Sequence, residues 1–190
     1  MIIKSFEIEN NLKIVKEKNI FLFYGENIGL KKYLKELILI KKKKTNNKIN
    51  ILYYVEDEIL KQTELLYNSI SSESLFLDKQ IFIIEKSSDK FLKILEKILE
   101  YDDGSFSFIL LSDILDKKSK LRNIFEKNKQ IICVPCYKDN LRTLEIIAKK
   151  ELNKENIICS NETISFLINK AAGDRNYLLN ELNKIKLFSK

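Results

Sequence analysis

Five short runs of branched and aromatic apolar residues constrain the fold of this chain more than any other feature. They cover residues 20–24, 49–55, 81–84, 107–111 and 131–134. Each run has the length and composition of a buried strand. Segments with helical apolar spacing separate them, such as residues 91–99 and, after a possible cap at Asp116, residues 121–125. This alternation predicts an open, mostly parallel α/β sheet with helices on both faces.

The pattern changes after residue 137, where strand-like runs stop and three segments with helical spacing follow. Their apolar residues lie at positions 141, 144, 147 and 152, at 164, 167, 168 and 171, and at 178, 182 and 185. Asp139 can cap the first helix, while Gly173 can end the second and Asp174 can cap the third. The sequence therefore predicts an α/β domain over residues 1–137 and a small helical domain over residues 138–190.

The first predicted strand runs directly into the position where nucleotide-binding α/β proteins carry a phosphate-binding loop. Such a loop needs glycine-rich backbone, a lysine for the terminal phosphates and a serine or threonine for magnesium. Gly25 and Gly29 are present, but Leu30 takes the place of the lysine. Lys31 and Lys32 follow where the hydroxyl is expected. The two glycines can also shape a tight strand-to-helix turn, and the missing hydroxyl favours this interpretation over phosphate binding.

The end of the third predicted strand also lacks the residues of a nucleotide-hydrolysing site. Such a site holds an aspartate for the metal and a glutamate for the attacking water, whereas this strand ends in Glu85 and Lys86. The chain has no histidine, and no serine or cysteine stands beside a recognisable base. We therefore expect no catalytic residue, no metal and no cofactor.

Five segments together resemble the delta subunit of the bacterial DNA polymerase III clamp loader, in its N-terminal two domains. They are LFYGENIGL at 22–30, SLF at 74–76, LDKKSKL at 115–121, PCYKD at 135–139, and the stretch from GDR at 173–175 through residue 182. Each segment is short, and their order and spacing carry the match over essentially the whole chain. The resemblance implies an AAA+ fold that does not bind ATP, in a non-catalytic subunit of the polymerase holoenzyme.

In that family an exposed hydrophobic pair within the Ser-Leu-Phe segment enters a pocket of the sliding clamp. The resemblance places this pair at Leu75 and Phe76. The preceding residues, 68–74, form the longest polar, turn-prone tract of the α/β part, and an apolar pair on a polar loop can anchor a partner. The same pair can instead tuck under the loop into the core, and the resemblance decides for the clamp.

The resemblance also implies a set of partners. They are the beta sliding clamp, the gamma/tau and delta prime subunits of the loader, and DNA within the assembled loader; no membrane is involved. The family's third domain, a helical collar that joins the subunits, would begin near Lys190 and is absent from this sequence.

Arg175 matches the sensor arginine of AAA+ lids and, without a nucleotide, can bridge the two domains.

The net charge permits a polyanionic partner without requiring one. Lysine and arginine exceed aspartate and glutamate by seven. The run Lys41 to Lys44 can contact DNA phosphates, or it can be a solvated helix end whose charge suits the helix dipole. No aromatic residue interleaves with these lysines, which favours the solvated end.

Two functions remain as alternatives to the clamp-loader subunit: a nucleotide-binding AAA+ module of another system and a basic nucleic-acid-binding domain.

The cysteines and the absence of a targeting signal predict a soluble protein in a reducing, cytoplasmic compartment. Cys133, Cys136 and Cys159 are odd in number, and the N-terminus lacks the long apolar stretch of a secretory signal. Cys133 and Cys136 have the spacing of a redox motif, but they stand at the end of a predicted strand and not at a helix N-terminus. We predict that both are buried side chains.

Overall fold

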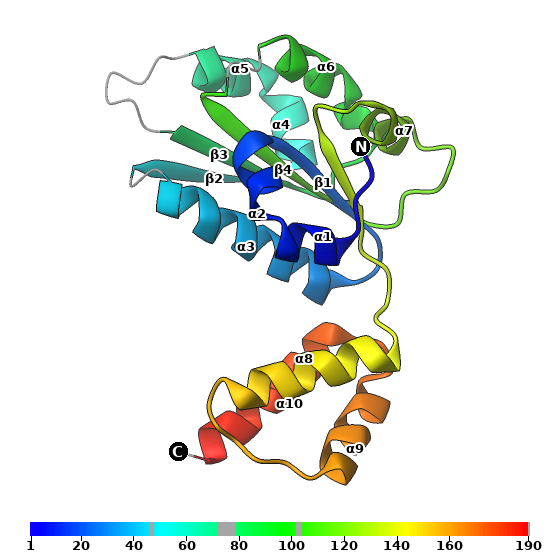
Figure 1. The fold of residues 1–190 in the computed structure, drawn as a ribbon. Helices are drawn as coiled ribbons and strands as arrows, with labels where there is room; N and C mark the ends of the chain where they lie inside the picture. Colours follow the sequence, from blue (N-terminus) through cyan, green and yellow to red (C-terminus); the bar gives the residue numbers. More distant parts are fainter. Residues whose placement is uncertain (46–47, 72–78, 102–103, 190) are drawn as a thin grey trace. The chain divides into compact units, whose positions relative to one another are not determined.

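The computed structural model describes residues 1–45, 48–71, 79–101 and 104–189 (Figure 1). These residues form two compact units. An α/β unit contains Met1–Gly25 and Leu34–Pro135, and a helical unit contains Glu26–Tyr33 and Cys136–Lys190. The helical unit thus includes a short segment from the first part of the chain, which nothing in the sequence had indicated.

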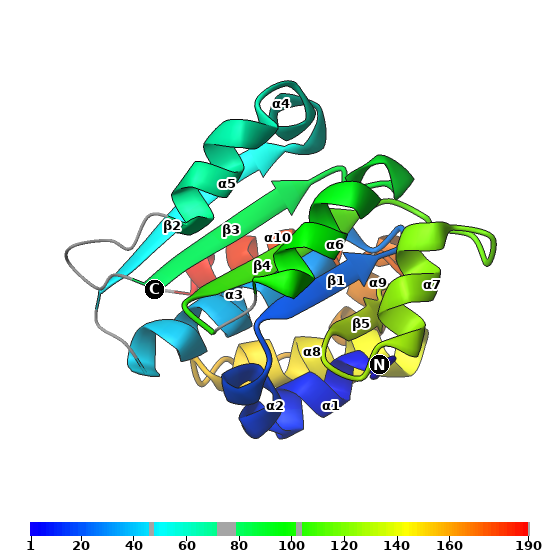
Figure 2. The same cartoon turned by 90° about the horizontal axis from the view of Figure 1, so that it is seen from above.

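The α/β unit is built on a parallel sheet of five strands in the described part of the chain (Figures 1 and 2). Along the chain they are β1 Ile20–Tyr24, β2 Ile49–Val55, β3 Lys79–Glu85, β4 Phe106–Ser112 and β5 Ile132–Pro135. Their order across the sheet is β2-β3-β4-β1-β5, and every pair is parallel. All residues of β1 are buried, as expected for an inner strand covered on both faces. The predicted open parallel sheet is confirmed.

Helices cover both faces of this sheet (Figure 1). One face carries α1 Ser5–Asn10, α2 Leu12–Glu17 and α3 Ile28–Thr45; the other carries α4 Glu56–Lys61, α5 Thr63–Ser71, α6 Leu92–Glu100, preceded by the 3-10 turn η1 Asp89–Phe91, and α7 Lys120–Lys127. Alternate strand residues such as Leu22, Phe82 and Phe108 form one core with the second group of helices. The rings of Phe82 and Phe108 stack with their centroids 4.7 Å apart.

The helical unit consists of α8 Leu141–Asn153, α9 Asn161–Ala171 and α10 Arg175–Phe188 around a core of its own. The predicted three helices are confirmed, and so is Asp174 as the cap of α10, since its carboxylate accepts the amides of Asn176 and Tyr177. The predicted cap of α8 was wrong. Asn140 accepts the amide of Thr143 at this helix start, because the carboxylate of Asp139 is engaged elsewhere.

Two further local predictions in the α/β unit were wrong. Ser119, not Asp116, caps α7 by accepting the amide of Arg122, while Asp116 accepts the amides of the preceding turn. Residues 68–71 of the polar tract are not loop but the last part of α5. They are helical because Ile70 packs against the core of the sheet.

The run of lysines 41–44 lies in the last turns of α3. The Nζ atom of Lys42 donates to the carbonyl of Lys18 at 3.1 Å and to Oδ1 of Asn19 at 3.0 Å, so this lysine ties the helix end to the residues just before β1. Lys43 and Lys44 are exposed. Among the described helices, α3 included, none combines the length and the apolar character needed to cross a bilayer.

Candidate functional site

The loop that leaves β1 begins at Gly25, in the α/β unit. Its φ of +129° lies where side chains are rarely tolerated, which explains the glycine. Its amide donates to the carbonyl of Asp113 at 3.1 Å. The first glycine of the phosphate-loop position therefore shapes the turn and uses its N–H group within the protein.

Asn27 organises the next part of the loop, in the helical unit, and is 4% exposed. Its backbone amide donates to the carbonyl of Cys136 at 3.0 Å. Its side-chain Nδ2 donates to the carbonyl of Tyr137 and to Oδ2 of Asp139, both at 2.9 Å. Its Oδ1 accepts the amide of Leu30 at 2.9 Å. All hydrogen-bonding groups of this buried amide side chain are thus directed at the helical unit itself.

Arg175, the first residue of α10, forms a two-point ion pair with Asp139. Its Nε donates to Oδ2 at 2.8 Å and its Nη2 to Oδ1 at 2.7 Å. The two side chains are only 7% and 6% exposed. The guanidinium also lies over the ring of Tyr33, 5.8 Å from its centroid. A parallel, buried pair of this kind is among the strongest polar contacts a protein makes, so the position of Arg175 is fixed.

Gly29 brings the start of α3 against the start of α10. A Cβ atom added at this glycine would lie 2.7 Å from the backbone nitrogen of Asn176 and 3.1 Å from its Cα. Real Cβ atoms do not approach backbone so closely, and the contact therefore requires glycine. Since Asp174 caps α10, the amides of Asn176 and Tyr177 at this helix start are occupied by the chain's own carboxylate.

The residues predicted for the phosphate-loop position are therefore divided between the two units. Gly25 belongs to the α/β unit, while Gly29, Lys31 and Lys32 belong to the helical unit. Lys31 is buried and Lys32 is exposed. The sequence pointed to Arg175, but it did not reveal the partners that hold it. The one available signal was indirect: buried polar residues beside a glycine-rich turn must find hydrogen-bond partners.

Carboxylates stand where β2 and β3 end, and one of them, that of Glu56, serves local structure. Glu85 and Lys86 are both exposed, and Lys86 has a φ of +58° in the turn after β3. Glu56, 4% exposed, accepts the backbone amide of Ser88 at 2.6 Å and its hydroxyl at 2.7 Å. The buried carboxylate of Glu56 thus holds the turn that follows β3 through these two hydrogen bonds.

Leu75 and Phe76, predicted to contact a partner, lie outside the described residues. They belong to the connection between α5, which ends at Ser71, and β3, which begins at Lys79. Their predicted role stays a prediction.

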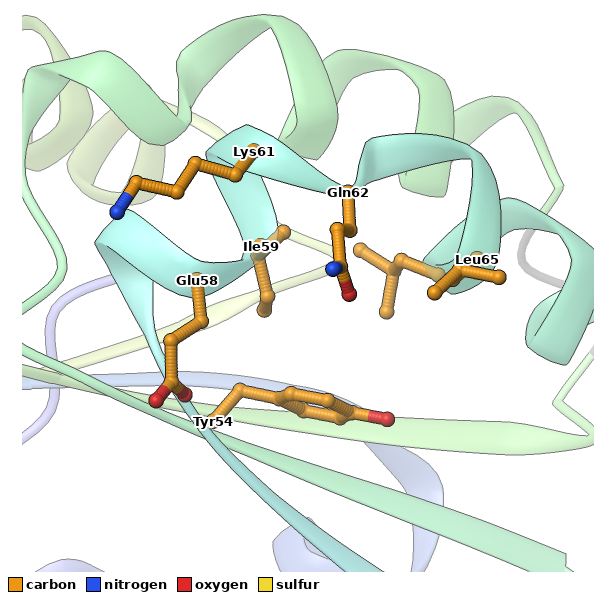
Figure 3. Close-up of a pocket in the computed structure, with 7 residues that line it drawn as sticks. Tyr54, Glu58, Ile59, Lys61, Gln62 and Leu65 are labelled. Carbon is orange, nitrogen blue, oxygen red and sulfur yellow. The ribbon is translucent and has the colours of Figure 1, made fainter.

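A groove of about 380 Å³ lies elsewhere in the α/β unit, between the end of β2 and the helices α4 and α5. Figure 3 shows Tyr54 of β2 along one side, with Ile59 and Gln62 pointing toward its ring. Glu58 at one end is already used, since its Oε2 accepts the amide of Val55 at 3.0 Å. The lining offers no pair of groups arranged for proton transfer.

Cys133 and Cys136 are both fully buried, which confirms the prediction for this pair. Burial raises the pKa of the Cys133 thiol to about 12, so a thiolate does not form there near neutral pH. Cys159 is half-buried in the helical unit. Redox chemistry at the Cys133–Cys136 spacing is therefore not supported.

The sequence of the chain is similar to that of a probable DNA polymerase III subunit delta from Rickettsia prowazekii (strain Madrid E). The two are 25% identical over 168 residues, which is 88% of this chain and 50% of the relative. The chain thus spans half the length of that relative. No protein-family model matches the chain.

The fold is similar to those of two solved replication proteins. Domain III of the Thermotoga maritima replication initiation protein DnaA gives a TM-score of 0.59 at 15% identity, covering 97% of this chain and 83% of that one. The Bacillus subtilis DNA clamp loader delta protein gives a TM-score of 0.59 at 16% identity, covering 97% of this chain and 57% of that one. The AAA+-like fold and the resemblance to the delta subunit, both predicted from the sequence, are confirmed.

Proposed function

We propose that this chain is a clamp-loader subunit of the delta type, which grips and opens the sliding clamp during DNA replication. The sequence similarity to a probable DNA polymerase III subunit delta over 88% of the chain carries this proposal. The AAA+-like fold agrees with it. In this role the chain supplies binding energy and no chemistry of its own, as a non-catalytic subunit of a polymerase holoenzyme in the cytoplasm.

Leu75 and Phe76 are the proposed clamp contact. Two adjacent large apolar side chains can fill a partner's pocket, and a few such residues supply most of the energy of an interface. If the pair binds the open form of the clamp more tightly than the closed form, it shifts the clamp toward opening by that difference in affinity. Neighbouring loader subunits that bind ATP would control when this contact is available.

We also propose that this chain neither binds nor hydrolyses ATP. The phosphate-loop position has no serine or threonine at Lys31 or Lys32 to hold magnesium. Arg175, which would face a phosphate in a nucleotide-binding lid, is neutralised by the carboxylate of Asp139. Gly29 packs against protein backbone. These features support a subunit that works without nucleotide of its own.

A second candidate is a nucleotide-binding AAA+ module of another replication system. The match to DnaA domain III, with the same TM-score as the match to the clamp-loader protein, favours it. This candidate requires measurable affinity for ATP or ADP in the presence of magnesium. A nucleotide titration followed by calorimetry separates the two, since the delta-type subunit is expected to give no heat of binding.

Titration of the purified chain into its cognate sliding clamp tests the main proposal. We expect the wild-type chain to bind, and the Leu75→Ala/Phe76→Ala variant to bind at least about a hundredfold more weakly, since truncating a central interface residue costs about 2 kcal/mol or more. A matched control is Ile146→Ala/Phe166→Ala, which removes two exposed apolar side chains of the helical unit. Equal affinity of the Leu75/Phe76 variant and the wild type would refute the contact.

A further inference from the structure

We propose that residues 26–33 are ordered by the chain's own side chains, through a latch formed by Asn27, Asp139 and Arg175, and need no nucleotide to fold. This inference concerns how the loop is held and does not depend on clamp binding. It assigns to Asn27 and Asp139 a positioning role that the sequence did not reveal.

The first support is that backbone amides of this loop already have hydrogen-bond partners in the protein. A phosphate-binding loop presents its N–H groups to the phosphates of a nucleotide. Here the amide of Asn27 donates to the carbonyl of Cys136, that of Ile28 to Glu26, that of Leu30 to Oδ1 of Asn27, and that of Lys31 to the carbonyl of Asn27, all between 2.9 and 3.1 Å. These four amides are satisfied within the helical unit, so they have no need of an anion.

The second support is the charge arrangement around Asp139. Its Oδ2 accepts from both Nδ2 of Asn27 and Nε of Arg175, and its Oδ1 accepts from Nη2 of Arg175. Its backbone amide donates to the carbonyl of Gly173 at 3.2 Å. The buried carboxylate of Asp139 therefore joins the loop to the start of α10. The Asp139 carboxylate binds the guanidinium of Arg175 at two points, as a phosphate group would. Unlike a bound phosphate, this carboxylate is part of the chain and does not dissociate.

The third support is the fit between the loop and α10. Gly29 lies so close to the backbone of Asn176 that a Cβ atom could not be added without a shift. Leu30 is buried beside it. The latch and this close packing act on the same eight residues, so the loop should be one of the rigid parts of the helical unit.

Amide hydrogen exchange of the intact chain, followed by mass spectrometry of peptides that cover residues 26–33, tests the latch. We expect slow exchange in the wild type and the same rates with and without Mg·ATP. In Asp139→Ala the exchange of these peptides should accelerate at least about tenfold, since a buried charge-assisted hydrogen bond is worth more than the 1.4 kcal/mol that corresponds to that factor.

Glu151→Ala is the matched control, because Glu151 pairs with Lys186 inside the same unit and does not touch the loop. It should leave the loop peptides unchanged. If Asp139→Ala also exposes the core of α9, the milder Asn27→Ala replaces it and should accelerate the loop alone. Rapid exchange in the wild type that slows on adding Mg·ATP would overturn the latch, and so would unchanged loop exchange in both latch variants.

Discussion

Replacing Gly29 with alanine should destabilise the helical unit, although the same change inside a helix ordinarily stabilises. Alanine is favoured over glycine by about 1 kcal/mol in a helix interior. At this position its Cβ would lie 2.7 Å from the nitrogen of Asn176. Backbone shifts forced by overpacking cost about 1–3 kcal/mol. Because Asn27 and Asp174 restrain both sides of the contact, we expect the upper part of this range and a net loss of about 1–2 kcal/mol.

Urea denaturation followed by helical circular dichroism measures this loss. Lys32→Ala is the control, since Lys32 is exposed and lies one turn along the same helix. It should change the free energy of unfolding by no more than about 0.5 kcal/mol. A Gly29→Ala variant as stable as the wild type, or more stable, would show that α10 can shift without a loss of stability. The close contact would then not restrict position 29 to glycine.

Two further predictions concern ionisable groups. Burial raises the pKa of Cys133 to about 12. A thiol-reactive disulfide reagent at pH 8 should therefore modify the half-buried Cys159 and leave Cys133 unmodified. Rapid labelling of Cys133 in the folded chain would contradict this. Partial burial raises the pKa of Asp89, but hydrogen bonds, first among them that from the amide of Leu121, lower it more, to below its ordinary 3.8. The contribution of Asp89 to the free energy of unfolding is therefore complete above about pH 4 and is lost as the pH falls through the lower folded pKa. In Asp89→Asn the free energy of unfolding should consequently fall less steeply below about pH 4 than in the wild type. The same steepness in both proteins would refute this contribution of Asp89.

The elements of the core could be predicted from the sequence because burial leaves a direct pattern there. The run Ile20–Tyr24 is entirely apolar or aromatic, and the structure buries all of it. The helical spacing after residue 140 likewise marks the residues that form the second core. The short helices α4 and α5 carry weaker patterns, since their stability comes from packing against the sheet and not from their own sequence.

The latch could not be predicted, because its contacts join residues far apart in the chain. Asp139 and Asn140 are both good helix caps, and nothing local decides which one caps α8. The choice is made by Arg175, 36 residues away, which takes the carboxylate and leaves the cap to Asn140. For the same reason the sequence did not show that residues 26–33 cluster with the helical unit.

Release of the cognate sliding clamp from circular DNA, measured with and without Mg·ATP, tests the central claim most directly. A delta-type subunit that opens the clamp by binding alone should accelerate release to the same extent in both conditions. The Leu75→Ala/Phe76→Ala variant should give only the spontaneous rate. Release that is no faster than the spontaneous rate with the folded wild-type chain, or that depends on ATP, would contradict the account.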